Sequence, residues 1–575
     1  MIKMTDIKIF LIGLVISSGL LWPLFVAPYF SHHDDVQAIR LFEMDKCFQD
    51  LQIPCRWVPD VGDGYGYPLF NYYGPAPYYY GELIYSLTHS ITFSVKTMFG
   101  TAFLLSYVFM FLLGRKIWGG WGGLYSGLFY TLAPYHSLVF YVRGAMAEDW
   151  GLVWMPAILW ALLRLREKTN TANLSLVSLF MALLIASHNL TVLMFAPFLL
   201  LFILINYNSR KFIIYAFIAI ILSVMLSGFY SLPMFLEKSL THVESTTYGY
   251  FSYTEHFKGL KKLFLDFSWG WGDSVREVPG GPKDGLSFQI GIIHWLIFAL
   301  CLILSFKKAF LQKEKKIGDE TFDKKIIFIC LGIFLMSVIL IHPRSTYIWA
   351  SIPNLKYIQF PWRFLGQIIL ALSIVAGSFP LLVKSNKFSK IIIPGILILL
   401  IAANVSYFRP KEFLNLTDQN ILSGERWLAQ THRSILDYLP IFAKEPPPRY
   451  KPSDYQVLTG DMSISDYKQG TNWIKFNAHV STHSILRISQ YYFPEWKILD
   501  NNKPIVFDYE NTLGLMTIIL GEGDHQISLK LHDTPIRTFG NTLTVSTIAV
   551  LLFILLSQNK SIKRRLSYYM KELSK

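Results

Sequence analysis

The stretch FSHHDDVQAIR, from Phe30 to Arg40, places two histidines and two aspartates directly after the first long apolar run of the chain. Ionisable side chains at the end of a membrane segment are costly unless they are paired, face water or bind a ligand. The stretch therefore predicts where a membrane helix ends and where polar chemistry begins.

The rest of the chain is unusually apolar. It has 575 residues, of which 52% are hydrophobic and 16% charged, which is too apolar for a string of ordinary soluble domains. Because a helix needs about 20 apolar residues to cross a bilayer, we expect about twelve spans. They are 7–29, 97–113, 119–135, 148–163, 172–188, 192–207, 211–234, 286–306, 325–341, 363–383, 390–407 and 541–557.

Basic residues fix the expected orientation, because short loops rich in Lys and Arg stay cytoplasmic. With a cytoplasmic N-terminus, every strongly basic short loop falls on the cytoplasmic side. These segments are 115–116, 164–168, 210–211, 307–325, 384–390 and 560–575. The net charge of +14 is thus mostly a topology signal and needs no nucleic acid to explain it.

The external face receives the larger polar pieces, which are 30–96, 235–285, 342–362 and 408–540. In the first piece, Val36 to Leu51 shows an amphipathic pattern, with an apolar stripe of Leu41, Met44, Phe48 and Leu51 that predicts a helix lying in the membrane interface. The following stretch, VGDGYGYPLFNYYGPAPYYY at 61–80, predicts an aromatic loop at headgroup level. Residues 78–92 predict a surface or re-entrant helix.

The cysteines divide by location. Cys47 and Cys55 share the first external loop and form a disulfide if that compartment is oxidising. Cys301 and Cys330 lie within predicted spans, where we expect them to be packing residues.

Acidic residues mark two places at the external ends of spans. One aspartate of the opening stretch, most simply Asp35, is expected to cap the following helix, and Asp34 then faces a cavity, because adjacent residues in extended chain point opposite ways. In YVRGAMAEDW, at 141–150, Arg143, Glu148 and Asp149 stand where the fourth span begins. There Arg143 and Glu148 either form an ion pair or belong to a site.

Other external polar and aromatic residues fall in short segments. HPRS, at 342–345, holds Arg344, and QFPWRFLG, at 359–366, holds Arg363. A lone arginine there often snorkels, but two in one short loop also suit a phosphate. In FSWGWGDSVREVPGGPKDG, at 267–285, Trp269 and Trp271 are either a sugar-stacking platform or membrane anchors.

The last external piece, 408–540, has the sequence pattern of β-strands in its second half. After a proline-rich joint at 442–455, alternating apolar and polar residues separated by turn residues predict an antiparallel sheet or sandwich. We expect a linker at 411–455, a β-domain at 456–540, and a final transmembrane helix with a basic cytoplasmic tail at 541–575.

These features together resemble the GT-C superfamily of glycosyltransferases, which includes the protein O-mannosyltransferases and the aminoarabinose transferases. The resemblance rests on the acidic pair after span one, the helix that follows it, the acid at span four and the external C-terminal domain, and it covers about residues 1–410 as a transmembrane domain. HDDVQAIR, RGAMAEDW and QFPWRFL also resemble an uncharacterised bacterial membrane family labelled 6-pyruvoyl-tetrahydropterin synthase-related.

The resemblance implies a polytopic α-helical protein of the bacterial inner membrane, with about twelve transmembrane helices and a C-terminal external β-sandwich-like domain. Both termini would be cytoplasmic and the active face periplasmic or extracellular. It further implies an inverting glycosyltransferase that moves a sugar from a polyprenyl-phosphate carrier to a glycan, lipid or protein acceptor. The alternatives are a flippase or transporter of a lipid-linked glycan, and a catalytically inactive scaffold whose β-domain binds glycan.

Under this resemblance the superfamily's first acid falls on Asp34 or Asp35 and its second on Glu148 or Asp149. The residues expected to bind phosphate are Arg143, Arg344 and Arg363. Those expected to contact substrate are Tyr67, His188, Trp269 and Trp271. No cofactor is implied with certainty, although His33 and Asp35 are of the types that bind a divalent metal.

Overall fold

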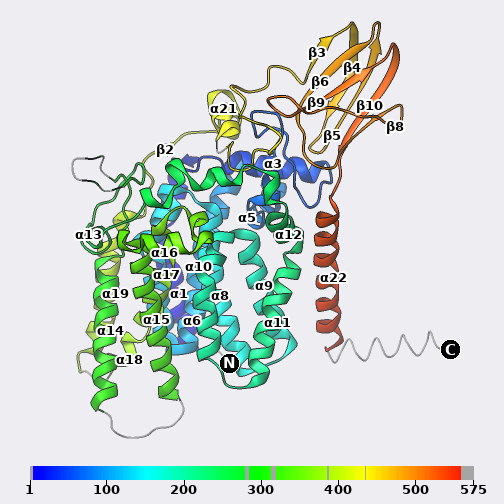
Figure 1. Cartoon of the computed structure of the whole chain (residues 1–575). Coiled ribbons are helices and arrows are strands. Elements are labelled where there is room, and N and C mark those ends of the chain that lie inside the picture. The colour runs from blue at the N-terminus through cyan, green and yellow to red at the C-terminus, as the bar shows by residue number, and fades with distance from the viewer. Residues whose placement is uncertain are drawn as a thin grey trace, which may run out of the picture.

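The computed structural model of the chain describes residues 4–276, 278, 281, 284–311, 319–384, 387–433 and 435–558. Figure 1 shows a bundle of helices with the four pieces that were predicted to be external gathered at one end, called the external end below, and a β-domain standing beyond it. The first residues of α1 lie at the opposite end (Figure 1). Residues 312–318 of the basic segment 307–325 and the predicted basic tail at 560–575 lie outside the described residues.

Each predicted span coincides with helical structure, because long apolar runs satisfy their backbone groups internally as helices. The elements are α1 (Met4–Gly19) with α2 (Pro23–Val26), α6 (Ile91–Thr131), α8 (Met146–Glu167), α9 (Thr171–Ser187), α10 (Asn189–Ile205), α11 (Arg210–Leu226) with α12 (Gly228–Leu236), α14 (Ile292–Leu311), α15 (Asp319–Ile341), α17 (Leu365–Ala376) with α18 (Phe379–Val383), α19 (Ser389–Asn404) and α22 (Pro535–Ser557). The range of α6 contains two predicted spans, which meet at a non-helical Gly119.

Within the described residues, four helices are long and apolar enough to cross a membrane, or up to six if each bent pair is one span. The bent pairs turn by 80° between α11 and α12 and by 89° where α15 meets α16 (Thr346–Ser351). These apolar helices indicate an integral membrane protein. The count of about twelve spans stays a prediction.

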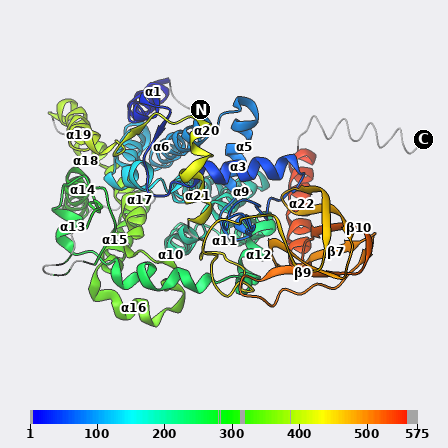
Figure 2. The same cartoon turned by 90° about the horizontal axis from the view of Figure 1, so that it is seen from above.

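Helix α3 (Gln37–Gln49) lies across the external end of the bundle, beside α21 (Gly424–His432) (Figure 2). Leu41 and Met44 of the predicted apolar stripe are buried, but Leu51 lies beyond the helix and is 82% exposed. The Phe42 ring contacts Trp427 of α21, with 5.9 Å between centroids. The amphipathic helix thus forms close to its predicted bounds, and the segment expected to be a linker packs against it through Trp427. Its place in a membrane interface stays a prediction.

Part of the predicted aromatic loop at 61–80 packs against the β-domain. Tyr65 and Tyr72 belong to the hydrophobic core of that domain, together with Trp57 just before the loop, and the rings of Tyr65 and Tyr491 lie 5.3 Å apart. The Tyr65 carbonyl accepts a hydrogen bond of 2.9 Å from the Tyr491 amide. Contact with the strands therefore accounts for the burial of these rings, and a position of the loop at headgroup level stays a prediction.

The β-domain consists of two antiparallel sheets that share one core. In β5 the alternate residues Ile474, Phe476, Ala478 and Val480 are buried, which is the predicted period of two. One sheet has the order β4 (Met462–Gln469), β5 (Trp473–Val480), β10 (Gly523–Leu531), β7 (Trp496–Asp500) and β8 (Lys503–Pro504). The other has the order β3 (Tyr455–Thr459), β6 (Ser484–Tyr491) and β9 (Leu515–Leu520).

Shorter elements connect these layers. Cys47 and Cys55 form a disulfide, as the oxidising alternative predicts, and Cys301 and Cys330 are buried free thiols. The connecting elements are β1 (Tyr29–Phe30), which pairs with β2 (Phe413–Leu414), and α4 (Leu69–Tyr72), α5 (Ala76–Thr88), α7 (Pro134–Ser137), α13 (Leu260–Phe264) and α20 (Asp418–Ile421).

One carboxylate of the segment 411–455 caps a helix of the bundle. Asp418 accepts hydrogen bonds of 2.8 Å from the backbone amides of Ile91 and Thr92, the first residues of α6. These amides have no partner within the helix, so Asp418 satisfies them and also places negative charge at the positive helix end.

We predict that Asp418→Ala lowers the free energy of unfolding by about 1 kcal/mol, the usual contribution of a helix cap. The measurement is thermal unfolding of the full chain in detergent. Glu522→Ala, which removes an exposed carboxylate of the β-domain, is the control and should leave the unfolding temperature unchanged. Equal effects of the two variants would contradict the capping role.

Candidate active site

The two acidic motifs meet through their backbones at the external end of the bundle. The His33 amide donates to the Val142 carbonyl and the Asp34 amide donates to the Arg143 carbonyl, each at 2.9 Å. Gly144, which follows, has a φ of +61°. A β-carbon at this glycine would lie 2.5 Å from the His32 ring, so the close approach of the two motifs requires glycine.

Glu148 lies between two guanidinium groups. Its carboxylate is 2.6 Å from Arg143 Nη1 and 3.6 Å from Arg363 Nε, and it accepts a hydrogen bond from the Tyr135 hydroxyl. Arg143, Glu148 and Arg363 are all buried. The ion pair expected as one alternative is present, and Arg363 makes it a cluster with two cations and one anion.

Arg143 is oriented further by its surroundings. Its guanidinium lies over the Trp362 ring at 4.7 Å, an arrangement that favours the cation. Burial lowers the pKa of Arg143, but the negative charge of Glu148, helped by Asp34, outweighs burial and holds this pKa above its ordinary value. The side chain is therefore a permanent positive charge.

Asp149 does not join Glu148. It is fully buried, and its Oδ1 lies 3.5 Å from His136 Nε2 in the interior of the bundle. Adjacent residues of a helix point about 100° apart, so the acids of the EDW motif separate once α8 forms. Of the two expected second acids, only Glu148 lies with the arginines.

The two aspartates of the opening stretch also have different environments. Asp35 forms an ion pair with Arg426 of α21. Helix α3 has Val36 at its N-cap position without a side-chain capping bond, so the prediction that Asp35 caps it is wrong: its carboxylate binds a guanidinium instead. Asp34 is partly exposed, and its carboxylate has no hydrogen-bond or ion-pair partner in the described part of the chain.

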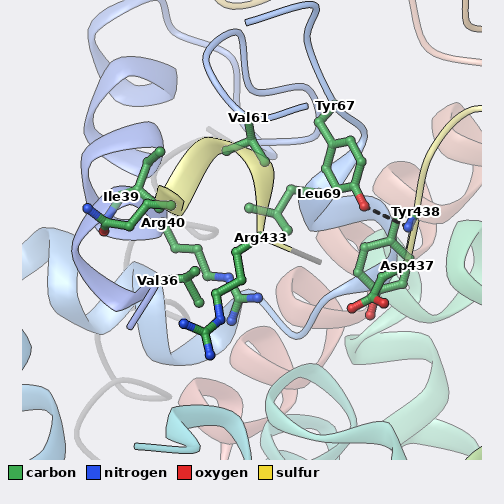
Figure 3. Close-up of a pocket in the computed structure, with 10 residues that line it drawn as sticks. Val36, Ile39, Arg40, Val61, Tyr67, Leu69, Arg433, Asp437 and Tyr438 are labelled. Carbon is green, nitrogen blue, oxygen red and sulfur yellow. Dashed lines mark hydrogen bonds between the residues drawn. The ribbon is translucent and has the colours of Figure 1, made fainter. Parts of the chain in front are cut away.

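A pocket lined by Val36, two residues after Asp34, brings together arginines from distant segments. Figure 3 shows the guanidinium groups of Arg40, from α3, and Arg433, from the end of α21, lying close together in it. The cavity is about 20 Å³, enough for one water molecule. Its lining is Val36, Ile39, Arg40, Val61, Tyr67, Leu69, Gln430, Arg433, Asp437 and Tyr438.

Neither pocket arginine has a carboxylate ion pair among the residues that the structure describes. Arg40 stacks over the Tyr73 ring at 3.9 Å, and its Nη1 is 3.5 Å from the Tyr78 hydroxyl. Arg433 is exposed. The lining thus holds two guanidiniums and one carboxylate, that of Asp437, and its net positive charge favours an anion.

Of the predicted substrate contacts, Tyr67 lines this pocket but uses its hydroxyl structurally. It donates to the Ile435 carbonyl at 2.9 Å and accepts from the Tyr438 amide at 2.7 Å. Tyr67 thus fixes the chain that carries Tyr438 and Asp437. His188 is hydrogen-bonded through Nδ1 to the Thr191 hydroxyl at 2.7 Å.

The tryptophans of the second external loop contact other external segments. The Trp271 ring contacts His33, with 4.3 Å between ring centroids. Trp269 stacks with Arg409, whose guanidinium lies 5.0 Å from the ring. Both rings are partly exposed, and both contact cationic or imidazole side chains of the external segments.

Arg344 lies apart from the other predicted phosphate ligands. It belongs to the short turn Pro343–Ser345 after α15, and its side chain is exposed. Among the described residues no ion pair or hydrogen bond joins its side chain to the Glu148 cluster. The sequence therefore grouped three arginines of which the structure brings two together.

The proposed metal ligands are engaged elsewhere. Burial lowers the pKa of His33 to about 4, so its imidazole is neutral at pH 7, and its ring faces Trp271. Asp35 is paired with Arg426. In the part of the chain that the structure describes, no three His, Cys, Asp or Glu side chains form a group that could hold a metal ion.

Several residues of the site were not identified from the sequence. Arg40 was assigned to the polar side of a surface helix, and Arg426 and Arg433 lay in the segment expected to be a linker. The signal available in the sequence was that Arg40, Arg426 and Arg433 all fall in segments predicted to be external, as Asp34 does. Only the fold shows that α21 reaches α3.

Comparisons with known proteins give distant likenesses. No protein-family model matches the chain. An uncharacterized protein of Lactococcus lactis subsp. cremoris is 21% identical over 224 residues, which are 36% of this chain and 36% of that protein.

Among solved structures, the chain is similar to arabinofuranosyltransferase AftD from Mycobacteria, with a TM-score of 0.44 and 11% identity over 73% of this chain and 28% of that chain. It is also similar to the Archaeoglobus fulgidus oligosaccharyltransferase AglB in complex with an inhibitory peptide and a dolichol-phosphate, with a TM-score of 0.43 and 10% identity over 71% of this chain and 55% of that chain. Both are GT-C superfamily members.

The chain thus spans 28% of AftD, 55% of AglB and 36% of the Lactococcus protein. At these TM-scores and identities, the likenesses do not assign a function to it.

We predict that Gly144→Ala destabilises the protein by more than the roughly 1–2 kcal/mol that a left-handed residue costs by itself. The added β-carbon would meet His32. Gly249→Ala is a matched control, because Gly249 has a φ of +59° and a β-carbon there would have nothing within 4 Å. Thermal unfolding of both variants measures the difference, and similar losses would show that the close approach is unimportant.

We predict that Glu148→Gln lowers stability by roughly 3–5 kcal/mol, because it leaves two buried guanidiniums without a counter-charge. Glu244→Gln is the control, since Glu244 pairs with Lys356 on the exposed surface and such pairs contribute at most about 1 kcal/mol. Denaturation of the two variants in detergent provides the comparison. A Glu148 variant as stable as the Glu244 variant would contradict the buried-cluster interpretation.

Proposed function

We propose that this chain is a membrane glycosyltransferase that moves a sugar from a polyprenyl-phosphate carrier to a glycan, lipid or protein acceptor on the external face. The observation that carries the proposal is Asp34: a partly exposed carboxylate without a partner in the described residues, two residues before Val36, which lines a pocket containing Arg40 and Arg433. A carboxylate that is free to accept a proton, on the segment that also lines a pocket of net positive charge, suits a reaction that removes a proton and releases a phosphate.

Asp34 is the proposed general base. In an inverting transfer the base takes the proton of the acceptor hydroxyl as that hydroxyl attacks the anomeric carbon opposite the leaving group. A carboxylate already held by a guanidinium is a poorer base, which excludes Asp35 from this role in the arrangement seen. The backbone hydrogen bond from Asp34 to Arg143 holds the base against the second motif.

Arg40 and Arg433 are the proposed ligands of the leaving phosphate. Guanidinium groups bind phosphate oxygens with paired, charge-assisted hydrogen bonds. The pocket of about 20 Å³ is too small for a phosphate as it stands, so the exposed Arg433 side chain would move when donor binds. The buried Arg143 and Arg363 add positive potential that Glu148 neutralises only in part.

The position of the site at the external ends of the helices supports a lipid-linked donor. A polyprenyl tail in the bilayer would hold its phosphate at the membrane surface, near α3 and the segments that cover it (Figure 1). Positioning the reactants and stabilising the phosphate charge would then be the main contributions of the protein.

The test compares wild type, Asp34→Asn and Asp35→Asn for release of polyprenyl phosphate from a panel of polyprenyl-phosphate sugars, with native envelope extract as acceptor. We predict that Asp34→Asn lowers the release rate by about 10²- to 10⁴-fold, the usual contribution of a general base. Its unfolding temperature should not fall, because the carboxylate makes no ion pair.

Asp35→Asn is the matched variant. It removes the pair with Arg426, so we expect lower stability but a release rate within about tenfold of wild type, since positioning alone is affected. Release that survives in Asp34→Asn and is abolished in Asp35→Asn would reverse the assignment. Absence of release with every donor, alongside donor binding by all three proteins, would favour a flippase or a scaffold.

A further inference from the structure

A second cationic cavity lies away from Asp34, between the disulfide loop, the end of β10 and the start of α22. It has a volume of about 220 Å³, large enough for a phosphate-bearing headgroup. Its lining residues are Leu51, Gln52, Ile53, Pro54, Arg56, Asn472, Lys530, Leu531, His532, Asp533 and Arg537. None of them belongs to the proposed transferase site.

Charge in this lining is predominantly positive. Arg56, Lys530 and Arg537 contribute cations, and Asp533 is the acid. Asp533 forms an ion pair with Arg56, with 3.1 Å between Asp533 Oδ1 and Arg56 Nε. Lys530 is exposed at the end of β10, and no acidic side chain in the described part of the chain pairs with it.

Arg537 is the unusual member of the lining, because its side chain is fully buried. Its Nε donates to Glu237 at 2.8 Å, and its guanidinium lies 4.9 Å from the Phe493 ring. Both terminal nitrogens, Nη1 and Nη2, lack a hydrogen-bond partner among the described residues. Buried donors without partners are costly, which points to a ligand that would accept their hydrogen bonds.

The pKa of His532, which also lines the cavity, is affected by the positive charge around it. Burial, followed by the positive charges of Lys497 and Lys530, lowers the pKa of His532, so this imidazole stays neutral at pH 7. Arg56 is neutralised by Asp533 and Arg537 by Glu237, so the uncompensated positive charge of the lining is that of Lys530. Arg537 contributes its two hydrogen-bond donors without a partner among the described residues.

We propose that this cavity binds a phosphate group, held by Arg537 and Lys530 at the junction of the β-domain with its membrane helix. The planar guanidinium offers two adjacent donors that match phosphate oxygens, and the lysine supplies a mobile point charge. The cavity lies where α22, a predicted membrane helix, begins at Pro535. At this level a phosphate comes either from an anionic phospholipid headgroup or from the solution on the external side.

The experiment uses the full chain purified in detergent and has two arms. Native mass spectrometry measures retention of phosphatidylglycerol relative to phosphatidylcholine, and a separate titration measures the Kd of inorganic phosphate. We expect binding in at least one arm. Selective lipid retention identifies a headgroup as the source, and binding of inorganic phosphate alone identifies a soluble anion.

Lys530→Glu is the main variant, because this exposed side chain can be changed without disturbing the fold. It should weaken binding by about fivefold or more, the factor that one basic side chain contributes near an anionic headgroup. Lys503→Glu, an exposed lysine of β8 that does not line the cavity, should change binding less than about twofold because its charge is screened beyond a Debye length.

Arg537→Lys provides a second test, since it keeps the charge beside Glu237 but removes the two unpartnered nitrogens, and it should weaken binding at least as much as Lys530→Glu. Binding in neither arm would overturn the proposal. Equal weakening by Lys530→Glu and Lys503→Glu would also overturn it, because attraction to the whole β-domain surface would then explain the result. Transferase activity at Asp34 does not enter this test.

Discussion

The external end of this protein depends on the need to neutralise one buried carboxylate. Glu148 is at the start of α8, where it would be too costly as an isolated charge. Arg143 reaches it from the preceding turn and Arg363 from the segment before α17. The same turn presents the Val142 and Arg143 carbonyls to the backbone of His33 and Asp34. Three external segments are therefore fixed by one cluster, and the position of Asp34 follows from it.

The covering segments add the remaining charges of the site. Helix α3 carries Arg40, and α21 crosses it with Arg426 and Arg433. Asp35 and Arg426 neutralise one another, so within the described residues Asp34 is the acid of this pair that has no side-chain partner. The chain turns directly after Asp34, where the Val36 amide donates to the Asp34 carbonyl at 2.7 Å, and the two adjacent carboxylates therefore have different neighbours. Because Asp35 pairs with Arg426 and Glu148 with Arg143 and Arg363, most charges of the site are compensated and the fold remains stable.

The sequence predicted those features that depend on local pattern. The apolar runs form helices, the alternation in β5 forms a buried strand face, and Glu148 pairs with Arg143, which is only five residues away. Features that depend on contacts between distant segments were missed or wrong. Asp35 and Arg426 are separated by 391 residues, and Trp57 is buried by strands near Trp496. Aromatic rings suit a headgroup layer and a protein core equally well, so only contact with the β-domain shows which of these rings are buried.

The most direct test of the central claim is a structure of the full chain with a polyprenyl-phosphate sugar bound. The account predicts phosphate oxygens about 3 Å from the guanidinium nitrogens of Arg40 and Arg433, as charge-assisted hydrogen bonds require. It also predicts that the anomeric carbon faces the Asp34 carboxylate, with room between them for an acceptor hydroxyl. A phosphate bound at Arg344, or a donor whose sugar lies away from Asp34, would contradict it.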